Sequence, residues 1–260
     1  VPERGKKIRS IIAEMERIHS HLFIIGIICH DIGFETLFMH SWAYRERIME
    51  LFEKISGNRV HYGMNTFGGV RRDITNGLKN TLLSTLHELE KEIRILREDF
   101  QSNDILIDRL KGVGKLSNER AKELGVVGPI ARASGIREDI RLDCYDGYEF
   151  VDIEPSTRRA GDSLSRMEVR FDELFTSIEI INELLNTLPN GEIRGTRKFS
   201  IPAGEICFRV EAPRGENFHY LISNGRSASR VRVRPPTYAN FAALPEILMN
   251  HKLADAATII

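Results

Sequence analysis

The chain has 260 residues, in which 37 lysines and arginines balance 37 aspartates and glutamates. A formal charge of zero argues against a strongly basic nucleic-acid-binding domain. Hydrophobic residues make up 42% of the chain and charged residues 28%, which is typical of a globular protein with a sizeable core. The cysteines, Cys29, Cys144 and Cys207, include no CxxC pair. This excludes a disulfide scaffold and a self-contained cysteine metal site, and it fits a reducing cytoplasm.

The ends of the chain and its apolar runs bear on domain organisation. The longest apolar run covers residues 22–29, whereas a membrane span needs roughly 20 apolar residues. The sequence begins with a valine and stops inside an apolar stretch. We therefore expect a single domain over residues 1–260, truncated at both ends, with no transmembrane helix.

Helices dominate the first three quarters of the chain. Apolar residues that recur at spacings of three and four predict long helices over about residues 2–30, 42–56, 78–100 and 161–188. The third of these carries a leucine-rich seam of the kind that packs helical bundles. Shorter helices are predicted at 104–110 and 118–124. Residues 57–74 and 125–150, which are rich in glycine and other turn formers, are expected to be irregular.

The hydrophobic pattern changes near residue 191. Alternating residues with turn signals at Pro213-Arg214-Gly215 and Asn224-Gly225 predict two or three antiparallel strands. A short helix is expected after Pro245. The predicted fold class is mainly α: a helical bundle with a small antiparallel β element near residues 192–235.

Two side chains are candidates for chemistry. Asp31 directly follows the apolar run, where partial burial would raise the pKa of its carboxyl and suit it to proton transfer; the alternative is a solvated residue at a helix end. Arg214 stands in a turn fixed by Pro213, and its guanidinium suits an anionic or cyanide-like acceptor; the alternative is an exposed hairpin arginine. His19, His21 and His30 cannot share a metal on one helix and are interpreted as packing or capping residues.

Residues 111–125 (KGVGKLSNERAKELG) allow two further interpretations. The GxGK segment lacks the spacing of a phosphate loop. The same segment resembles the turn of a helix–hairpin–helix DNA-binding module, in which backbone N–H groups contact a phosphate. A glycine turn between two helices is the simpler interpretation, so no nucleic-acid partner is expected.

Several segments taken together resemble one family. They are residues 16–74, which contain "HDIG" and "NTFGGVRRDI", together with "GVVGPIARASG", "GDSLSRMEVRFDE" and "VEAPRGE". In this order they are similar to the large, catalytic subunit of nickel–iron hydrogenases, above all the membrane-bound, energy-converting group 4 enzymes (Ech-type, CO-induced and formate hydrogenlyase). They are also similar to the D subunit of complex I, the quinone-site component of NADH dehydrogenase, which shares the fold.

The resemblance implies an oxidoreductase. It implies H2 oxidation or proton reduction at a nickel–iron centre held by two CxxC pairs near the ends of the full subunit. Neither pair is in this chain, so no metal ligand or cofactor is expected in the isolated chain, which should be inactive. The alternatives are a quinone-site protein like the complex I D subunit and a helix–hairpin–helix nucleic-acid-binding or structural protein.

The resemblance also implies partners and site residues. The partners would be an iron–sulfur small subunit and membrane subunits, in a complex on the cytoplasmic side of the cell membrane; alone, the chain would self-associate. Arg214, with Pro213, matches the cofactor-binding arginine beside the diatomic ligands of iron in hydrogenases. Asp31 matches an aspartate linked to proton movement near the quinone cavity of the complex I D subunit.

Overall fold

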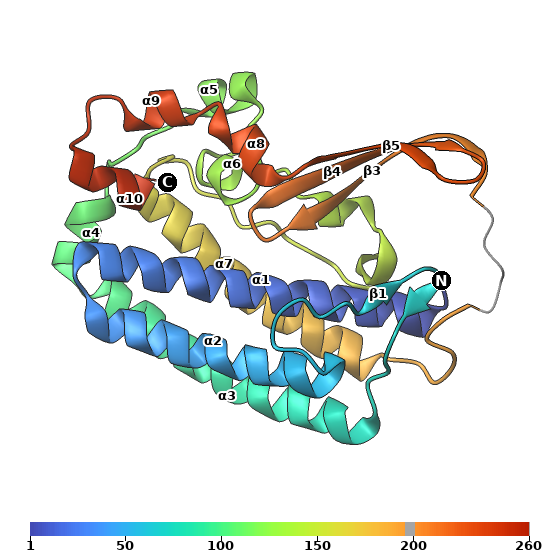
Figure 1. Cartoon of the computed structure of the whole chain (residues 1–260). Helices are drawn as coiled ribbons and strands as arrows, with labels where there is room; N and C mark the ends of the chain where they lie inside the picture. The colour runs from blue at the N-terminus through green and yellow to red at the C-terminus, as the bar shows by residue number, and fades with distance from the viewer. Residues whose placement is uncertain (196–200, 260) are drawn as a thin grey trace.

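The computed structural model describes residues 1–195 and 201–259. Four long helices form a bundle, in which α1 lies against both α2 and α7, and α3 also packs against both α2 and α7 (Figure 1). Their bounds are α1 Glu3–Ile32, α2 Glu35–Ser56, α3 Asn76–Gln101 and α7 Ser163–Asn186. One continuous apolar core fills the bundle, with α1 in its centre. Within the described part of the chain, no helix is long and apolar enough to cross a bilayer.

The predicted helices are confirmed, with one difference in length. Gly33 ends α1 in the left-handed conformation, as expected for a C-terminal glycine. The second helix begins at Glu35 and not near Trp42, because the break at Gly33 takes only two residues. Leu37 and Ser41 are buried in this added part of α2, and Ser41 donates a hydrogen bond to the Leu22 carbonyl of α1.

Short elements cover the bundle. The helices α4 Asp104–Leu110 and α5 Asn118–Leu124 lie where they are predicted, with Ser117 capping the second. The two segments expected to be irregular contain some regular structure. These elements are β1 Asn65–Thr66, β2 Gly69–Val70, α6 Pro129–Ala133 and the 3-10 helices η1 Ile140–Asp143 and η2 Asp146–Phe150.

A three-stranded antiparallel sheet projects from the bundle on the side of α6 (Figure 1). Its strands are β3 Ala203–Ala212, β4 Gly215–Asn224 and β5 Ala228–Arg234, in that spatial order. The small β element is therefore confirmed; residues 196–200 of its predicted range lie outside the described residues. The chain continues through α8 Pro236–Phe241, α9 Leu244–Leu248, η3 Leu253–Asp255 and α10 Ala256–Ile259.

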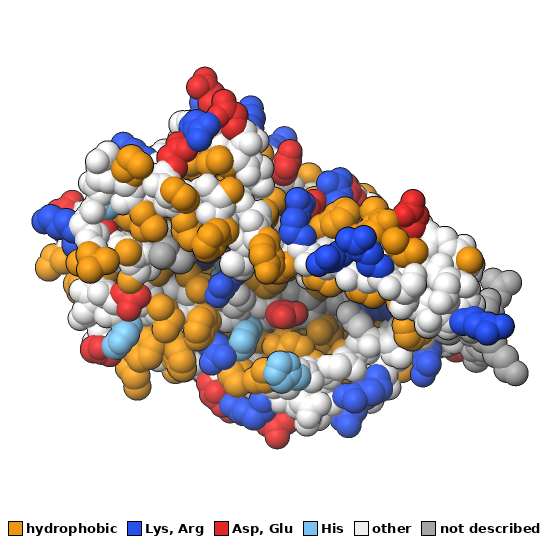
Figure 2. Space-filling model, turned by 45° about the horizontal axis from the view of Figure 1, so that its top comes forward, with side chains coloured by type: hydrophobic (Ala, Val, Ile, Leu, Met, Phe, Trp, Pro, Cys, Tyr) orange, Lys and Arg blue, Asp and Glu red, His pale blue; other side chains and the backbone are white. Residues whose placement is uncertain are grey.

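The face formed by the sheet and the C-terminal helices carries exposed apolar side chains (Figure 2). Tyr238, Phe241, Met249 and Leu253 are all more than half exposed. Basic side chains also lie over the sheet, where β5 has Arg230, Arg232 and Arg234. Apolar side chains grouped in this way are typical of surfaces that contact another protein.

Candidate site at the turn between β3 and β4

The turn between β3 and β4 presents Arg214. Ala212 pairs with Gly215, so Pro213 and Arg214 are the two residues of a tight hairpin turn. Gly215 and Gly128 have φ of 123° and 68°, and their backbones lie in close contact. A Cβ on Gly128 would lie 2.3 Å from the Arg214 carbonyl oxygen. Only glycine allows this approach, which fixes the turn against the start of α6.

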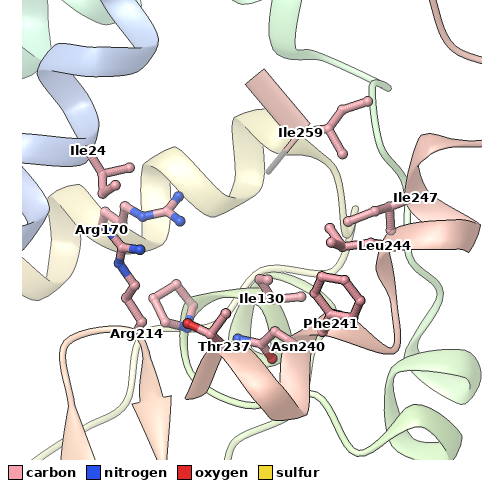
Figure 3. A pocket seen from close by; sticks show the side chains of 11 residues that line it. Ile24, Ile130, Arg170, Arg214, Thr237, Asn240, Phe241, Leu244, Ile247 and Ile259 are labelled. Carbon is pink, nitrogen blue, oxygen red and sulfur yellow. The ribbon is translucent and has the colours of Figure 1, made fainter. Parts of the chain in front are cut away.

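Arg214 borders a small cavity of about 130 Å³ (Figure 3). We name it the arginine cavity. It lies between α1, α6, α7, the β3–β4 turn and the C-terminal helices, and most of its wall is apolar. Pro213 does not line it. The lining residues are Ile24, Pro129, Ile130, Arg170, Arg214, Thr237, Asn240, Phe241, Leu244, Ile247 and Ile259.

A second arginine enters the same cavity. Arg170 reaches it from α7, and in Figure 3 its guanidinium lies near that of Arg214, beside Ile24. Neither guanidinium forms a hydrogen bond or ion pair with any residue that the structure describes. Burial lowers the pKa of Arg170 to about 10, with the positive charges of Arg166 and Arg214 acting in the same direction. Arg214 is exposed and Arg170 is half-buried, so the cavity is bordered by two cations that form no ion pair with a described carboxylate.

Below the turn, charged side chains form a network inside the protein. We call it the buried ionic network. All of its members are at most 5% exposed, and they come from α1, α6, α7, β3 and the segment around η1. Its members are Glu14, Arg17, His21, Arg132, Asp139, Arg141, Glu173 and Glu211.

The network holds the strand that leads into the turn. Arg17 donates hydrogen bonds to the carbonyl oxygens of Glu211, at 3.1 Å, and Ala212, at 3.3 Å. Arg132 Nη1 lies 2.9 Å from Glu211 Oε1, and the backbone N–H of Ile140 donates to Glu211 Oε2. Buried charges are stable only when they are paired and hydrogen-bonded, so these contacts fix the two residues before Pro213.

Two carboxylates hold these arginines in place. Glu173 binds Arg132 Nε at 2.7 Å, and Glu14 accepts from Arg17, Arg141, Tyr148 and Ser177. Burial opposes the ionisation of Glu14, but the nearby arginines and hydrogen bonds outweigh it and lower its pKa. At Glu211 burial dominates, and the pKa is raised despite Arg132.

His21 joins the network through its Nε2 atom, which lies 2.7 Å from Glu173 Oε2. Burial lowers the pKa of His21 to about 4, and Arg17 and Arg170 act in the same direction. The imidazole is therefore neutral near pH 7, and Nε2 donates its hydrogen to the Glu173 carboxylate. His21 is therefore a packing residue, as interpreted from the sequence, and its Nε2 atom is hydrogen-bonded to Glu173 within the core.

Acidification should destabilise the protein through His21. Between pH 6.5 and pH 4 the unfolded imidazole takes up a proton that native His21 does not bind. We expect the free energy of unfolding to fall by up to about 3 kcal/mol from this group as the pH drops through that range. Denaturant titrations at several pH values measure this effect. The free energy of unfolding should change less with pH in His21→Gln than in the wild type.

The control for this prediction is His30→Gln at an exposed position. Burial also lowers the pKa of His19 to about 4, so His19 contributes to the pH dependence of the wild type and of both variants alike. Equal pH dependence in His21→Gln and the wild type would contradict the assignment of a neutral His21.

Asp31 lies in the last turn of α1 and is exposed. The partial burial expected from sequence is absent in this chain. Ile24, which lines the arginine cavity, precedes Asp31 by seven residues, or about two helical turns. The two side chains therefore lie on the same side of α1, about 10 Å apart along the helix. The structure places Asp31 at the exposed end of α1, outside the residues that line the cavity.

The turn at residues 111–115 does not offer its N–H groups to a phosphate. The N–H of Gly112 donates to Asp162 Oδ2 at 2.8 Å, and that of Gly114 donates to His251 Nε2 at 3.1 Å. Both donors are used within the chain. The turn is therefore a packing element between α4, α7 and the C-terminal segment, which removes the observation behind the helix–hairpin–helix alternative.

The sequence matches the family described as "Respiratory-chain NADH dehydrogenase, 49 Kd subunit" over residues 31–198 and 193–260. The chain belongs to this family. Its relatives include the D subunit of F(420)H(2) dehydrogenase from Methanosarcina mazei, which is 39% identical. That match covers 99% of the chain and 72% of the relative.

The names of similar members of the 49 kDa family describe different functions. The membrane-bound hydrogenase subunit α of Pyrococcus furiosus is 37% identical, with 100% of the chain and 65% of the relative covered. The D subunit of the NADH-quinone oxidoreductase of Dehalococcoides mccartyi is also 37% identical, over 100% of the chain and 72% of the relative. The predicted resemblance to the hydrogenase large subunits and to the complex I D subunits is confirmed. Both groups are subunits of oxidoreductases.

The positions of the three cysteines show whether this chain could bind nickel. Cys29 is buried in the core, and Cys144 and Cys207 are exposed. No group of three or more His, Cys, Asp or Glu side chains among residues 1–195 and 201–259 could hold a metal ion. These residues do not fit a nickel ligand set, whereas the two arginines fit a polar or anionic group in the cavity.

Sequence reasoning found only part of this site. Arg214 was identified from turn chemistry and resemblance, and it does line the cavity. Arg170 and the buried ionic network were missed. The only local signal for them was a set of charged residues on the otherwise apolar faces of α1 and α7: Glu14, Arg17, Arg166, Arg170 and Glu173.

Proposed function

We propose that this chain is the central part of the catalytic subunit of a membrane-bound, energy-converting nickel–iron hydrogenase. The observation that carries the proposal is the arginine cavity. At about 130 Å³ it is smaller than the roughly 300–1,000 Å³ of sites that enclose drug-sized ligands such as a quinone ring with its tail. A small, mostly apolar space with two arginine donors suits H2 and a compact polar centre.

The chain's own residues would bind and orient. Arg214 would donate hydrogen bonds to a polar group at the mouth of the cavity, and its charge would remain fixed over any working pH. The buried ionic network would hold the backbone of the turn that carries Arg214 in place before any reaction begins. The apolar wall, which includes Ile24, Ile130 and Ile247, would exclude water and strengthen these interactions.

The metal would have to be bound outside the described residues. In the resembling hydrogenases, the nickel–iron centre is held by two CxxC pairs near the ends of the subunit, and when bound it supplies the chemistry of H2 cleavage. The chain spans 65% of the hydrogenase relative from P. furiosus. We accordingly propose the hydrogenase activity for the full-length subunit, and none for this chain alone.

A quinone-site subunit is the second candidate. The 37% identity to the D subunit of an NADH-quinone oxidoreductase over the whole chain favours it. In that case Arg214 would face a structural cavity, and the reaction would take place elsewhere on the subunit.

The proposed partners follow from the hydrogenase function. They are an iron–sulfur small subunit, which would carry the electrons, and membrane subunits that move ions. The complex would lie on the cytoplasmic side of the membrane. The P. furiosus relative, whose name describes a membrane-bound hydrogenase, supports this arrangement.

The test is an assay of the purified complex that contains the full-length subunit. H2 uptake with a viologen dye and reduction of a short-chain quinone should be measured on one preparation. The hydrogenase proposal predicts H2-dependent dye reduction without added quinone. Quinone reduction by a complex that neither consumes nor produces H2 would refute it and support the second candidate.

Asp31→Asn should slow proton-coupled turnover in the same complex. Asparagine keeps the shape and the hydrogen bonds of the side chain but cannot take up and release a proton at the working pH. Assembly and cofactor content should stay near normal. Activity measured against pH tests this, with the exposed Glu35→Gln as the control. Superimposable profiles for Asp31→Asn and the wild type would remove Asp31 from the mechanism.

A further inference from the structure

We infer that β5, an edge strand of the three-stranded sheet, binds an extended acidic segment of a partner protein, which adds to the sheet as a fourth strand. The segment would carry carboxylates at alternate positions, with apolar side chains between them. This surface lies outside the residues that line the arginine cavity, and the inference does not depend on the proposed hydrogenase function.

The backbone of β5 is open to pairing. The other edge strand, β3, packs against η1, and the N–H of its Glu211 donates to the Tyr145 hydroxyl. β5 pairs with β4 on one side and forms the outer edge of the sheet on the other (Figure 1). Within the described part of the chain, no backbone hydrogen bond joins this outer edge to another element. Alternate N–H and C=O groups of such an edge point outwards and can pair with another strand.

The side chains of β5 alternate in character, and all seven of its residues are exposed. Arg230, Arg232 and Arg234 lie on one face of the sheet, because successive side chains of a strand point to opposite faces. Val231 and Val233 lie on the other face and are 55% and 48% exposed. Charged side chains can protect an edge from pairing, but this edge also exposes apolar ones. The pattern therefore suits a partner strand with one acidic and one apolar face.

The arginines of β5 carry charge that the chain itself does not balance. Arg234 pairs with Glu216 at 2.6 Å, whereas Arg230 and Arg232 form no ion pair with any residue that the structure describes. The carboxylate nearest in register to Arg230 is that of Glu205 on β3, which accepts a hydrogen bond from the Tyr220 hydroxyl. Opposite charges on neighbouring strands stabilise their pairing. The open side of β5 is therefore complementary to carboxylates.

The same charges argue against other occupants. Two copies of β5, paired with their arginines on one face, would place like charges directly opposite each other, which destabilises strand pairing. A nucleic acid or an anionic membrane would contact the arginines but would leave the outward backbone groups and the exposed valines unused. An acidic strand of another protein engages all three features, in the manner of other peptides that add to a sheet edge.

A groove at the end of β5 next to α8 provides a place for a side chain of the partner. Its volume is about 630 Å³. Tyr238 of α8 is 74% exposed there, and the guanidinium of Arg234 lies 5.6 Å from the centre of the Phe218 ring. In strand addition, pockets for alternate side chains determine which segment binds. An apolar or aromatic side chain in this groove would fix the register of the added strand. The lining residues are Phe218, Arg232, Val233, Arg234 and Tyr238.

The experiment mixes the full chain with a fluorescently labelled seven-residue peptide of alternating glutamate and valine, and follows binding by fluorescence anisotropy. We expect one saturable site, and no binding of a peptide of alternating lysine and valine. A third peptide, with proline in place of the central valine, keeps every glutamate but loses a backbone donor. It should bind about tenfold or more weakly, because proline interrupts strand pairing.

A charge reversal on β5 locates the site. Arg232→Glu should weaken binding of the glutamate–valine peptide about fivefold or more, because it replaces an attraction with a repulsion. The same variant should bind the lysine–valine peptide more tightly than the wild type does. Its thermal unfolding should match that of the wild type, since Arg232 is exposed and unpaired among the described residues. Lys91→Glu, an equal change of charge at an exposed position of α3, provides the matched control.

Three results would overturn the inference. The first is the absence of a saturable site for the glutamate–valine peptide. The second is equal affinity for the proline peptide, which would show charge attraction without strand addition. The third is tighter binding to vesicles of phosphatidylglycerol than to the peptide, lost in Arg232→Glu, which would assign the surface to a membrane.

Discussion

Replacing Arg214 with lysine should reduce the turnover of the assembled enzyme about 100-fold or more, while the subunit stays folded. Lysine keeps the positive charge but loses the planar fork that can address two acceptors at once. Removing one well-placed donor from an active site costs on the order of 100- to 1,000-fold in rate. The turn should survive, because Pro213, Gly215 and the contacts of Glu211 set its backbone.

The measurement compares H2 turnover, nickel content and thermal unfolding in the wild type and Arg214→Lys. The matched control is Arg209→Lys, on β3 of the same hairpin but paired with Asp143 and Glu216 at the surface. Full activity in Arg214→Lys, with normal nickel content, would show that Arg214 is only a hairpin arginine.

Replacing Arg132 with methionine should destabilise the fold by about 3–5 kcal/mol, since it leaves Glu173 and Glu211 buried without their shared cation. Denaturant titration measures this loss. Arg137→Met provides the comparison: its ion pair with Glu154 is exposed on both sides, and such pairs contribute about 0–1 kcal/mol.

A double variant tests whether unpaired buried carboxylates cause the loss of stability in Arg132→Met. Adding Glu211→Gln to Arg132→Met removes one of the two stranded charges and should recover part of the lost stability. If the double variant is no more stable than Arg132→Met, the loss comes from packing around the arginine and not from the unpaired carboxylate.

The sequence predicts the helices of this fold well because their signals are local. The leucine seam of α3 and the end of α1 at Gly33 depend on residues within a few turns of each other. The start of α2 was misplaced because residues 35–41 form a weakly amphipathic stretch stabilised by packing on α1, as the bond from Ser41 to Leu22 shows. Tertiary contacts of this kind leave little trace in the hydrophobic pattern.

In the candidate site, too, features with a local sequence signal were predicted and features formed by distant residues were not. Arg214 could be found because its turn is defined by neighbouring residues. The network that supports it could not, since Arg17 and Glu211 are 194 residues apart and meet only in the folded chain. A charged residue on an apolar helix face, such as Arg17 or Arg170, is a usable signal for a buried site, but it does not identify the partner.

The exchange of D2 with water protons tests the central claim most directly, because it reports H2 cleavage without any electron partner. The account predicts that the complex with the full-length subunit forms HD. It also predicts that Arg214→Lys lowers this rate about 100-fold or more at unchanged nickel content. A wild-type complex that reduces quinone but forms no HD would contradict it.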